Sequence, residues 1–273
     1  MDPAELLLIG LIVLAGHAIG GIAAYGSVLV TLPLLILVIG PERHGDAVLL
    51  LLVLGTTQAM LILLRTWRHI DRRALRTMLV LAGIGLPFGF YFARALPQRP
   101  VLLALSAVII LAGLSRLARG LRTASEAEGG TARVLTRALI LLGGVIHGAF
   151  GAGGGTLVIY AQGALPRKEA FRGTMCTVWL CLNPIVLAMK GVGGGFGPKV
   201  FWWVLAGLPF LLAGNWIAQR VAERIDQKRF ARFVALLLVV SGTVLLAKNL
   251  SAREGAQAPP AIPAASTPRA PGP

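Results

Sequence analysis

Two glycine-containing stretches interrupt apolar sequence, and each is followed by a residue with a side-chain hydroxyl. GGIAAYG at 20–26 precedes Ser27, and GAGGG at 151–155 precedes Thr156. If a helix restarts after each break, its first turn presents unpaired backbone N–H groups and a partial positive charge. Glycine lets a ligand approach that backbone closely. The chemistry that this pattern predicts is the binding of an anion by helix N-termini.

The candidate binding residues are those of the two breaks and polar residues inside neighbouring apolar blocks. They are Gly26, Ser27, Gly153, Gly154, Gly155, Thr156, Thr57, Gln58 and Asn183. Glycine also serves close packing of membrane helices, and buried polar side chains often bond across helices. Both a ligand role and a packing role therefore stay open for each residue.

Two histidines are candidates for carrying a coupling proton. His17 stands four residues before Gly21, and His147 stands four residues before Gly151, so the pair is expected to occupy matching places. An ionisable residue inside a membrane segment is a functional candidate, and histidine titrates near neutral pH. The alternative is a neutral histidine bonded to a backbone carbonyl.

The composition indicates a membrane protein. Hydrophobic residues make up 56% of the chain and charged residues 14%, and the mean hydropathy is +0.78. The net charge of +15 comes from short basic clusters between apolar blocks, which is the pattern of membrane loops and not of a nucleic-acid-binding surface. Cys176 and Cys181 lie inside one apolar block, so we expect no metal site and no cofactor.

Apolar blocks of about 20 residues can cross a bilayer as helices. Six blocks are predicted full spans: 47–64, 77–93, 101–117, 173–189, 200–219 and 231–247. The two glycine-interrupted blocks, 5–39 and 134–165, are too long for one crossing and too short for two. We expect each to be a broken hairpin, meaning a helix that enters, breaks at the glycines and returns as a half-helix. The acidic N-terminus favours a first membrane element over a cleaved signal peptide.

The two halves of the chain repeat the same order of elements. GLPF occurs at Gly85–Phe88 and again at Gly207–Phe210, and each half reads as a broken hairpin followed by three spans. The predicted fold is an all-α polytopic membrane protein with two homologous halves. The expected segments are 1–118 and 134–250 for the halves, 119–133 for a polar linker, and 251–273 for a Pro/Ala-rich tail without fixed structure.

The basic residues favour an inverted repeat. If both broken hairpins return to the side from which they enter, the loops on one side hold most of the 26 basic residues, including Arg65, Arg167 and Arg172. If both hairpins cross fully, the bias is weaker. The positive-inside rule then assigns the richer side to the cytoplasm.

These residues resemble the TauE/SafE sulfite exporter family over residues 5–248. The sharpest part is HGAFGAGGGTLVIYAQGALP at 147–166, and its looser first-half counterpart is HAIGGIAAYGSVLVTLP at 17–33. The resemblance implies a secondary transporter of sulfite, a sulfonate or a related sulfur oxyanion in a bacterial inner membrane, with export and proton coupling as further expectations. The alternatives are an anion channel, an uptake permease for a small organic anion and, more distantly, an intramembrane enzyme. The sequence leaves the oligomeric state open.

Overall fold

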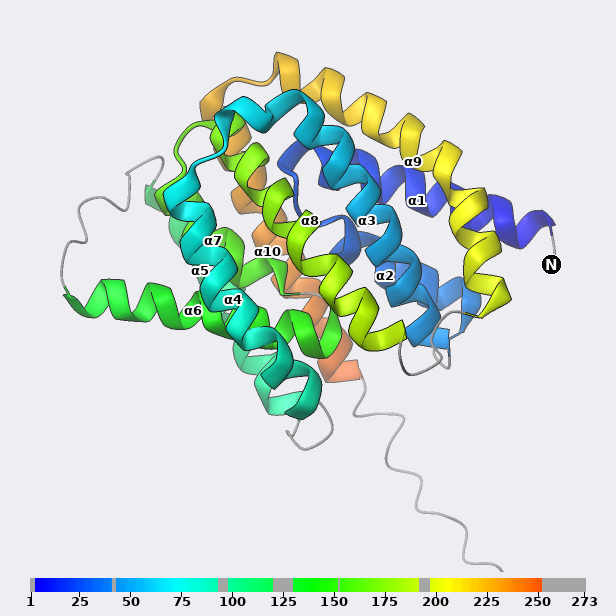
Figure 1. The fold of residues 1–273 in the computed structure, drawn as a ribbon, viewed down its shortest axis with the longest axis horizontal. Helices are drawn as coiled ribbons and strands as arrows, with labels where there is room; N and C mark the ends of the chain where they lie inside the picture. The colour runs from blue at the N-terminus through cyan, green and yellow to red at the C-terminus, as the bar shows by residue number, and fades with distance from the viewer. Residues whose placement is uncertain are drawn as a thin grey trace, which may run out of the picture.

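The computed structural model describes residues 3–40, 43–92, 98–119, 130–151, 153–191 and 197–251, and these are helical with no strand. Figure 1 shows the helices packed into one bundle. The helices are α1 (Pro3–Ala23), α2 (Ser27–Ile39), α3 (His44–Thr66), α4 (Arg72–Phe92), α5 (Gln98–Arg119), α6 (Gly130–Phe150), α7 (Gly154–Ala164), α8 (Lys168–Gly191), α9 (Pro198–Arg224) and α10 (Gln227–Ser251), with a 3₁₀ turn at Trp67–His69. The predicted tail, 251–273, lies outside the described residues except for Ser251, which ends α10, and the predicted linker, 119–133, lies outside them at 120–129.

The helices pair in a pattern that is preserved when the halves α1–α5 and α6–α10 are exchanged. Helix α1 packs along α9 as α6 packs along α4, while α3 pairs with α8 and α5 with α10 (Figure 1). The short helices α2 and α7 each fold back on the helix that precedes them. The order predicted from the sequence, a broken hairpin followed by three helices in each half, is confirmed.

Six of the described helices are long and apolar enough to cross a membrane: α1, α3, α4, α8, α9 and α10. Five of the six predicted spans are therefore confirmed. The sixth, 101–117, lies within α5, which is helical but is not one of these six. The remaining helix of these six is α1, which was predicted as part of a broken hairpin. It is long enough to cross a membrane because it continues without interruption as far as Ala23.

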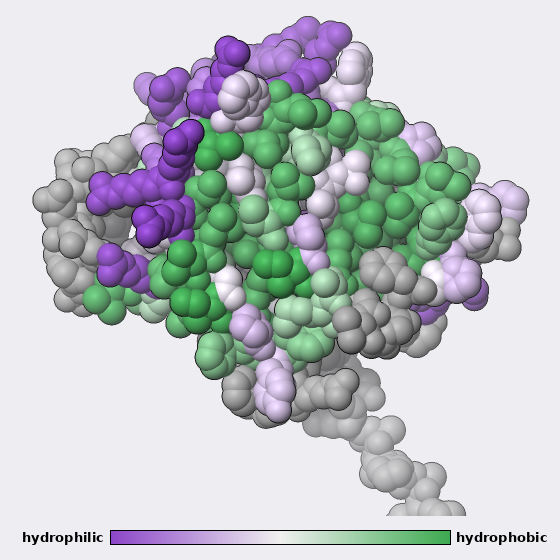
Figure 2. Space-filling model, viewed as in Figure 1, coloured by the Kyte–Doolittle hydropathy of each residue, from purple (hydrophilic) through white to green (hydrophobic). Residues whose placement is uncertain are grey.

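Large apolar side chains cover the outside of the bundle. Leu37 is 82% exposed and Tyr91 80% exposed, and Figure 2 shows one broad hydrophobic face with hydrophilic side chains gathered at its upper edge. A water-soluble protein rarely exposes so large a continuous apolar surface. This surface is suited to contact with lipid. The chain is therefore a multi-pass membrane protein.

Glycines let the paired helices approach to backbone contact. A Cβ atom added at Gly89 of α4 would lie 1.8 Å from the Val145 carbonyl oxygen of α6, and one at Gly144 would lie 2.1 Å from the Ala82 carbonyl oxygen. Helix α9 meets α1 in the same way, because a Cβ at Gly214 would lie 2.6 Å from the Leu14 carbonyl oxygen. Small residues give membrane helices the close van der Waals packing that holds them together.

Polar contacts bring several helix ends together at one end of the bundle, which we call the basic face. Arg65 at the end of α3 pairs with Glu223 of α9 at 3.0 Å. The Asp71 N–H before α4 donates to Thr174 Oγ1 of α8 at 3.0 Å, and Lys168 Nζ donates to the Ile225 carbonyl after α9 at 2.8 Å. Helices α3 and α9 thus end, and α4 and α8 begin, at the basic face.

Other helix ends meet around Arg43. Its guanidinium lies 3.9 Å from the Glu5 carboxylate of α1 and 4.4 Å from the ring centroid of Trp203, near the start of α9. Arg43 itself directly precedes α3 and follows α2. The first broken hairpin therefore starts and finishes at the end where α3 begins, whereas the second finishes at the basic face, where Lys168 opens α8.

Candidate functional site

The first break reverses the chain between α1 and α2. Helix α1 ends where the Tyr25 N–H donates to the Gly20 carbonyl at 3.0 Å. Ala24 has a φ of +54° and Gly26 a φ of +92°, and a left-handed backbone is unusual for alanine. Gly26 is the N-cap of α2 and has no side chain with which to cap it. The first-turn N–H groups of α2, beginning at Ser27 as predicted, are left without a side-chain acceptor.

The second break is built in a similar way from different residues. Helix α6 ends where the Gly151 N–H, at a φ of +69°, donates to the His147 carbonyl at 2.8 Å. Gly153 is the N-cap of α7, again without a capping side chain. The half-helix begins at Gly154, two residues before Thr156, near which the sequence predicted its start. Gly154 and Gly155 are thus helical, because packing within the hairpin outweighs the low helix propensity of glycine.

A pocket with mostly buried lining residues lies where both breaks meet the middle of α3 and α8. Its volume is ≈ 70 Å³ when measured as the space that the centre of a water molecule can occupy. One water needs at least about 10–15 Å³ on that measure, so the pocket has room for a small anion. It is lined by Ala24, Tyr25, Gly26, Ser27, Val28, Leu52, Gly55, Gln58, Ala59, Ile62, His147, Gly151, Gly154, Cys176, Trp179 and Asn183.

Six of the predicted site residues line this pocket. They are Gly26, Ser27, Gln58, His147, Gly154 and Asn183. Gln58 Nε2 donates to the His17 carbonyl at 2.7 Å, and His147 Nε2 donates to Asn183 Oδ1 at 3.1 Å. His147 Nδ1 is buried and has no hydrogen-bond partner. An unpartnered buried nitrogen at the wall of a cavity is a natural contact for a ligand or water.

The other predicted site residues lie beside the pocket and not in its lining. The Thr57 and Thr156 hydroxyls donate to carbonyls of their own segments, Val53 at 3.0 Å and Gly153 at 3.2 Å. A Cβ at Gly153 would lie 2.0 Å from the Gly143 carbonyl oxygen, and one at Gly155 would lie 2.5 Å from Ile109 Cδ1. These two glycines face α6 and α5, so close helix packing accounts for them.

The two histidines do not occupy matching places. His17 lies six residues before the end of α1, where its Nδ1 donates to the Val13 carbonyl at 2.8 Å. His147 lies three residues before the end of α6 and lines the pocket. The left-handed residues Ala24 and Gly151 mark the corresponding points of the two breaks. Alignment on these residues sets His147 against Gly20, not against His17.

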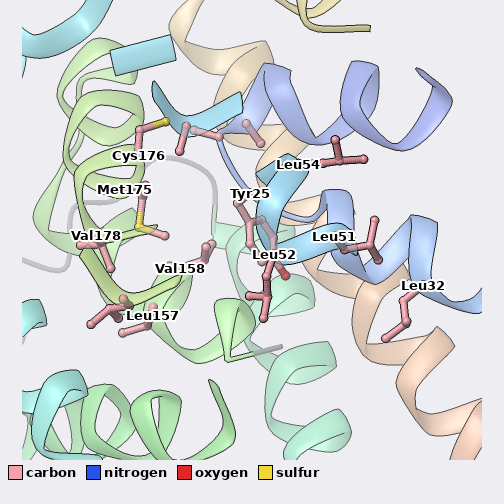
Figure 3. Close-up of a cluster of buried hydrophobic side chains, with 14 of the residues drawn as sticks. Tyr25, Leu32, Leu51, Leu52, Leu54, Leu157, Val158, Met175, Cys176 and Val178 are labelled. Atoms are coloured by element: carbon pink, nitrogen blue, oxygen red, sulfur yellow. The ribbon is translucent and has the colours of Figure 1, made fainter. Parts of the chain in front are cut away.

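Tyr25 and Trp179 are lining residues that the sequence interpretation missed. Trp179 Nε1 donates to the Ala24 carbonyl at 3.0 Å, and the Trp179 ring lies 5.6 Å from the His147 ring, centroid to centroid. Tyr25 joins the buried cluster in Figure 3, with Leu51 and Leu52 from α3 and Met175 and Cys176 from α8. The available signal was helical spacing, because Trp179 lies three residues after Cys176 and four before Asn183, on the same helix face.

The composition of the lining suits an anion. Among the described residues that line the pocket, none is aspartate or glutamate, and the polar groups include the amide side chain of Gln58 and the helix N-termini at Ser27 and Gly154. Across the described residues, no three His, Cys, Asp or Glu side chains lie close enough to hold a metal ion.

Comparison with known proteins assigns the chain to a family. The family model described as Sulfite exporter TauE/SafE matches residues 8–245, which is most of the chain. No curated protein and no solved structure matches the chain significantly. With a match over both halves and both glycine breaks, the chain belongs to the TauE/SafE family of sulfite exporters.

Proposed function

We propose that this permease is a secondary transporter that exports sulfite, a sulfonate or a related sulfur oxyanion across a bacterial inner membrane. The observation that carries the proposal is the pocket at which two uncapped helix N-termini meet. Ser27 opens α2 and Gly154 opens α7, and both residues line the same small cavity. Backbone N–H groups and helix dipoles bind an oxyanion without a permanent positive charge that would hold it too tightly.

The proposal includes an inverted repeat with the pocket near the centre of the bilayer. Helix α3 ends at the basic face where α8, its counterpart, begins, which supports opposite orientations of the two halves. The pocket contacts α3 and α8 at the middle of their lengths, at Gly55 and Trp179. Non-helical backbone at such a depth is tolerated where it lines a cavity. In this arrangement the basic face is cytoplasmic.

His147 is the residue we propose for proton coupling. It lines the pocket, its Nε2 is held by Asn183, and its Nδ1 is left to accept a proton or a hydrogen bond. An imidazole that gains a proton beside a bound anion offsets the charge of that anion. A proton and an anion would then move together.

Flux into and out of reconstituted vesicles tests this function. Purified protein is reconstituted, and the fluxes of sulfite, thiosulfate, sulfoacetate and simple carboxylates are compared. We expect saturable movement of the sulfur oxyanions that an imposed pH gradient accelerates. Flux proportional to concentration without saturation would instead identify an anion channel. Preference for a carboxylate would indicate a permease for organic anions, and no flux of any anion tested would overturn the proposal.

A further inference from the structure

Arg172 is a buried cation close to the pocket. The prediction that placed it in a loop is wrong, because it is the fifth residue of α8 and only 7% exposed. Its Nη2 donates to the Gly21 carbonyl of α1 at 3.2 Å and to Gln219 Oε1 of α9 at 2.8 Å. A charge inside a membrane protein is costly, so its presence there calls for a role.

No carboxylate of the described residues forms an ion pair with Arg172. Among the described residues, the acids nearest in its surroundings are engaged elsewhere, since Glu223 pairs with Arg65 and Glu169 with Lys168. The two acceptors that Arg172 contacts, a peptide carbonyl and an amide, are both neutral. Its Nε is buried without a hydrogen-bond partner. The guanidinium therefore keeps both its full charge and a free N–H donor.

Arg172 lies along α8 between the basic face and the pocket. Cys176, one helical turn further along α8, lines the pocket, whereas α8 begins at the basic face with Lys168. The fifth residue of α3, the counterpart helix, is Val48, so the first half contributes no such charge. Of α3 and α8, only α8 therefore places a buried cation between its first turn and the pocket.

Capping of α1 explains part of this arrangement. Gly21 lies in the last turn of α1, and a cation at a helix C-terminus is stabilising. That role uses one N–H and does not require burial of the rest of the group. It leaves the free Nε–H and the contact with Gln219 unexplained.

We propose that Arg172 is a second anion-binding station, at which a small sulfur oxyanion leaving or entering the pocket replaces Gln219 as the partner of the guanidinium. The station rests on the proposed function, because it serves the same anion path. Arginine binds oxyanions through paired N–H donors, and such charge-assisted bonds are stronger than those to an amide oxygen. A mobile anion can therefore displace Gln219, move on, and let Gln219 return.

Alkylation of Cys176 measures the local potential without relying on transport. In a Cys181→Ser background, Cys176 is treated separately with iodoacetate, an anion, and with the neutral iodoacetamide, which is similar in size. The ratio of the two rates cancels changes in thiol reactivity and reports attraction of the anion. We expect Arg172→Gln to lower this ratio on the order of fivefold, the effect of one nearby partly screened charge. Added sulfite should slow alkylation in the parent and much less in Arg172→Gln.

Two further variants separate the station from a structural cap. Gln219→Leu removes the competing acceptor and leaves the charge, so we expect the iodoacetate to iodoacetamide ratio to rise. Arg220→Gln removes an exposed arginine that packs on Trp216 of the same helix, 4.8 Å from its ring centroid, and should leave the ratio unchanged. If Arg172→Gln does not fold, Gln219→Leu tests the proposal alone, and an unchanged ratio in that variant would overturn it. Where both variants fold, an unchanged ratio in both would overturn it.

Flux in vesicles distinguishes failure of the station from failure of the proposed function. We expect Arg172→Gln to reduce sulfur-oxyanion flux about tenfold, as for loss of one charge-assisted hydrogen bond. Parent protein that moves no anion would refute the transport function itself. Parent protein that transports normally, with Arg172→Gln equally active and equally selective in alkylation, would refute only the station.

Discussion

The two long walls of the pocket have the same geometry and different chemistry. Leu52, Gly55 and Ala59 line it from α3, and Cys176, Trp179 and Asn183 line it from α8 with the same spacing. Each residue also has the same rank in its helix, counted from His44 and from Lys168. At these three places the α3 side is apolar or small, whereas the α8 side carries a thiol, an indole and an amide; the amide that α3 adds to the lining, Gln58, donates to the His17 carbonyl.

This difference shows how a duplicated scaffold can form an asymmetric site. The spacing places three side chains of each helix on the face that meets the other. The space beside Gly55 is open, since a Cβ at Gly55 would meet only Asn183 Nδ2, at 3.9 Å. A substrate in this pocket therefore has room beside Gly55 of α3 and a hydrogen-bonding partner opposite it in Asn183 of α8.

Closing the meeting point of the two breaks should have the largest effect. We predict that Gly154→Leu abolishes transport while the protein remains inserted. A Cβ at Gly154 would lie 2.9 Å from the Tyr25 ring, so a leucine side chain must occupy the pocket or push the first break away. Vesicle flux measures the loss, and membrane fractionation measures insertion.

Gly83→Leu is the matched control for that variant. Gly83 lies inside α4 with no atom within 4 Å of an added Cβ, so the same substitution meets open space there. Flux in Gly83→Leu should stay near normal. Normal flux in Gly154→Leu would remove the pocket from the transport path.

Filling the open side of the pocket should change which anions pass. We predict that Gly55→Ala transports nearly normally, whereas Gly55→Leu reduces sulfoacetate flux at least about tenfold and sulfite flux less. One methyl group fits the free space, but an isobutyl group takes up volume that a larger anion needs, and lost fit of this kind costs about 1–3 kcal/mol. The ratio of the two fluxes is the measurement. Equal losses for both anions would indicate general distortion and no role in selectivity.

The two histidines offer a comparison across the breaks. We predict that His147→Ala flattens the pH dependence of flux, because the imidazole that lines the pocket is lost. His17→Ala should keep the pH profile of the parent, since His17 lies outside the lining and its Nδ1 donates to its own helix at Val13. Flux measured at several pH values for each variant tests both. An unchanged profile in His147→Ala would assign that histidine a structural role.

The sequence could predict the breaks because glycine runs inside apolar blocks are rare and have a direct physical meaning. It could equally predict five spans and six lining residues, from hydrophobic length and from polar side chains at depth. It could not align the two breaks, because small residues substitute for one another. The sequence pattern placed Ser27 and Thr156 at equivalent points, each directly after its glycine break, whereas the structure makes Gly26 and Gly153 the two N-caps.

Arg172 and Trp179 show a second limit of sequence interpretation. Arg172 stands beside other basic residues near a helix start, and only the packing of α1 and α9 against α8 buries it. Trp179 reads as one more large apolar residue until its indole N–H finds the carbonyl of Ala24. Both roles depend on contacts between segments more than 40 residues apart in the chain, which no local pattern encodes.

The smallest effect should come from the single bond that joins the α8 wall to the first break. We predict that Trp179→Phe reduces flux about fivefold, because it removes one hydrogen bond, worth about 1 kcal/mol, and retains an aromatic ring beside His147. Ala24 has a left-handed backbone that is unfavourable for alanine, and the Trp179 N–H helps to hold it. Trp216 is an exposed tryptophan on α9, so Trp216→Phe is the control for loss of an indole elsewhere in the same protein. If both variants transport equally well, the first break keeps its shape without the Trp179 bond, and the α8 wall acts only through Cys176 and Asn183.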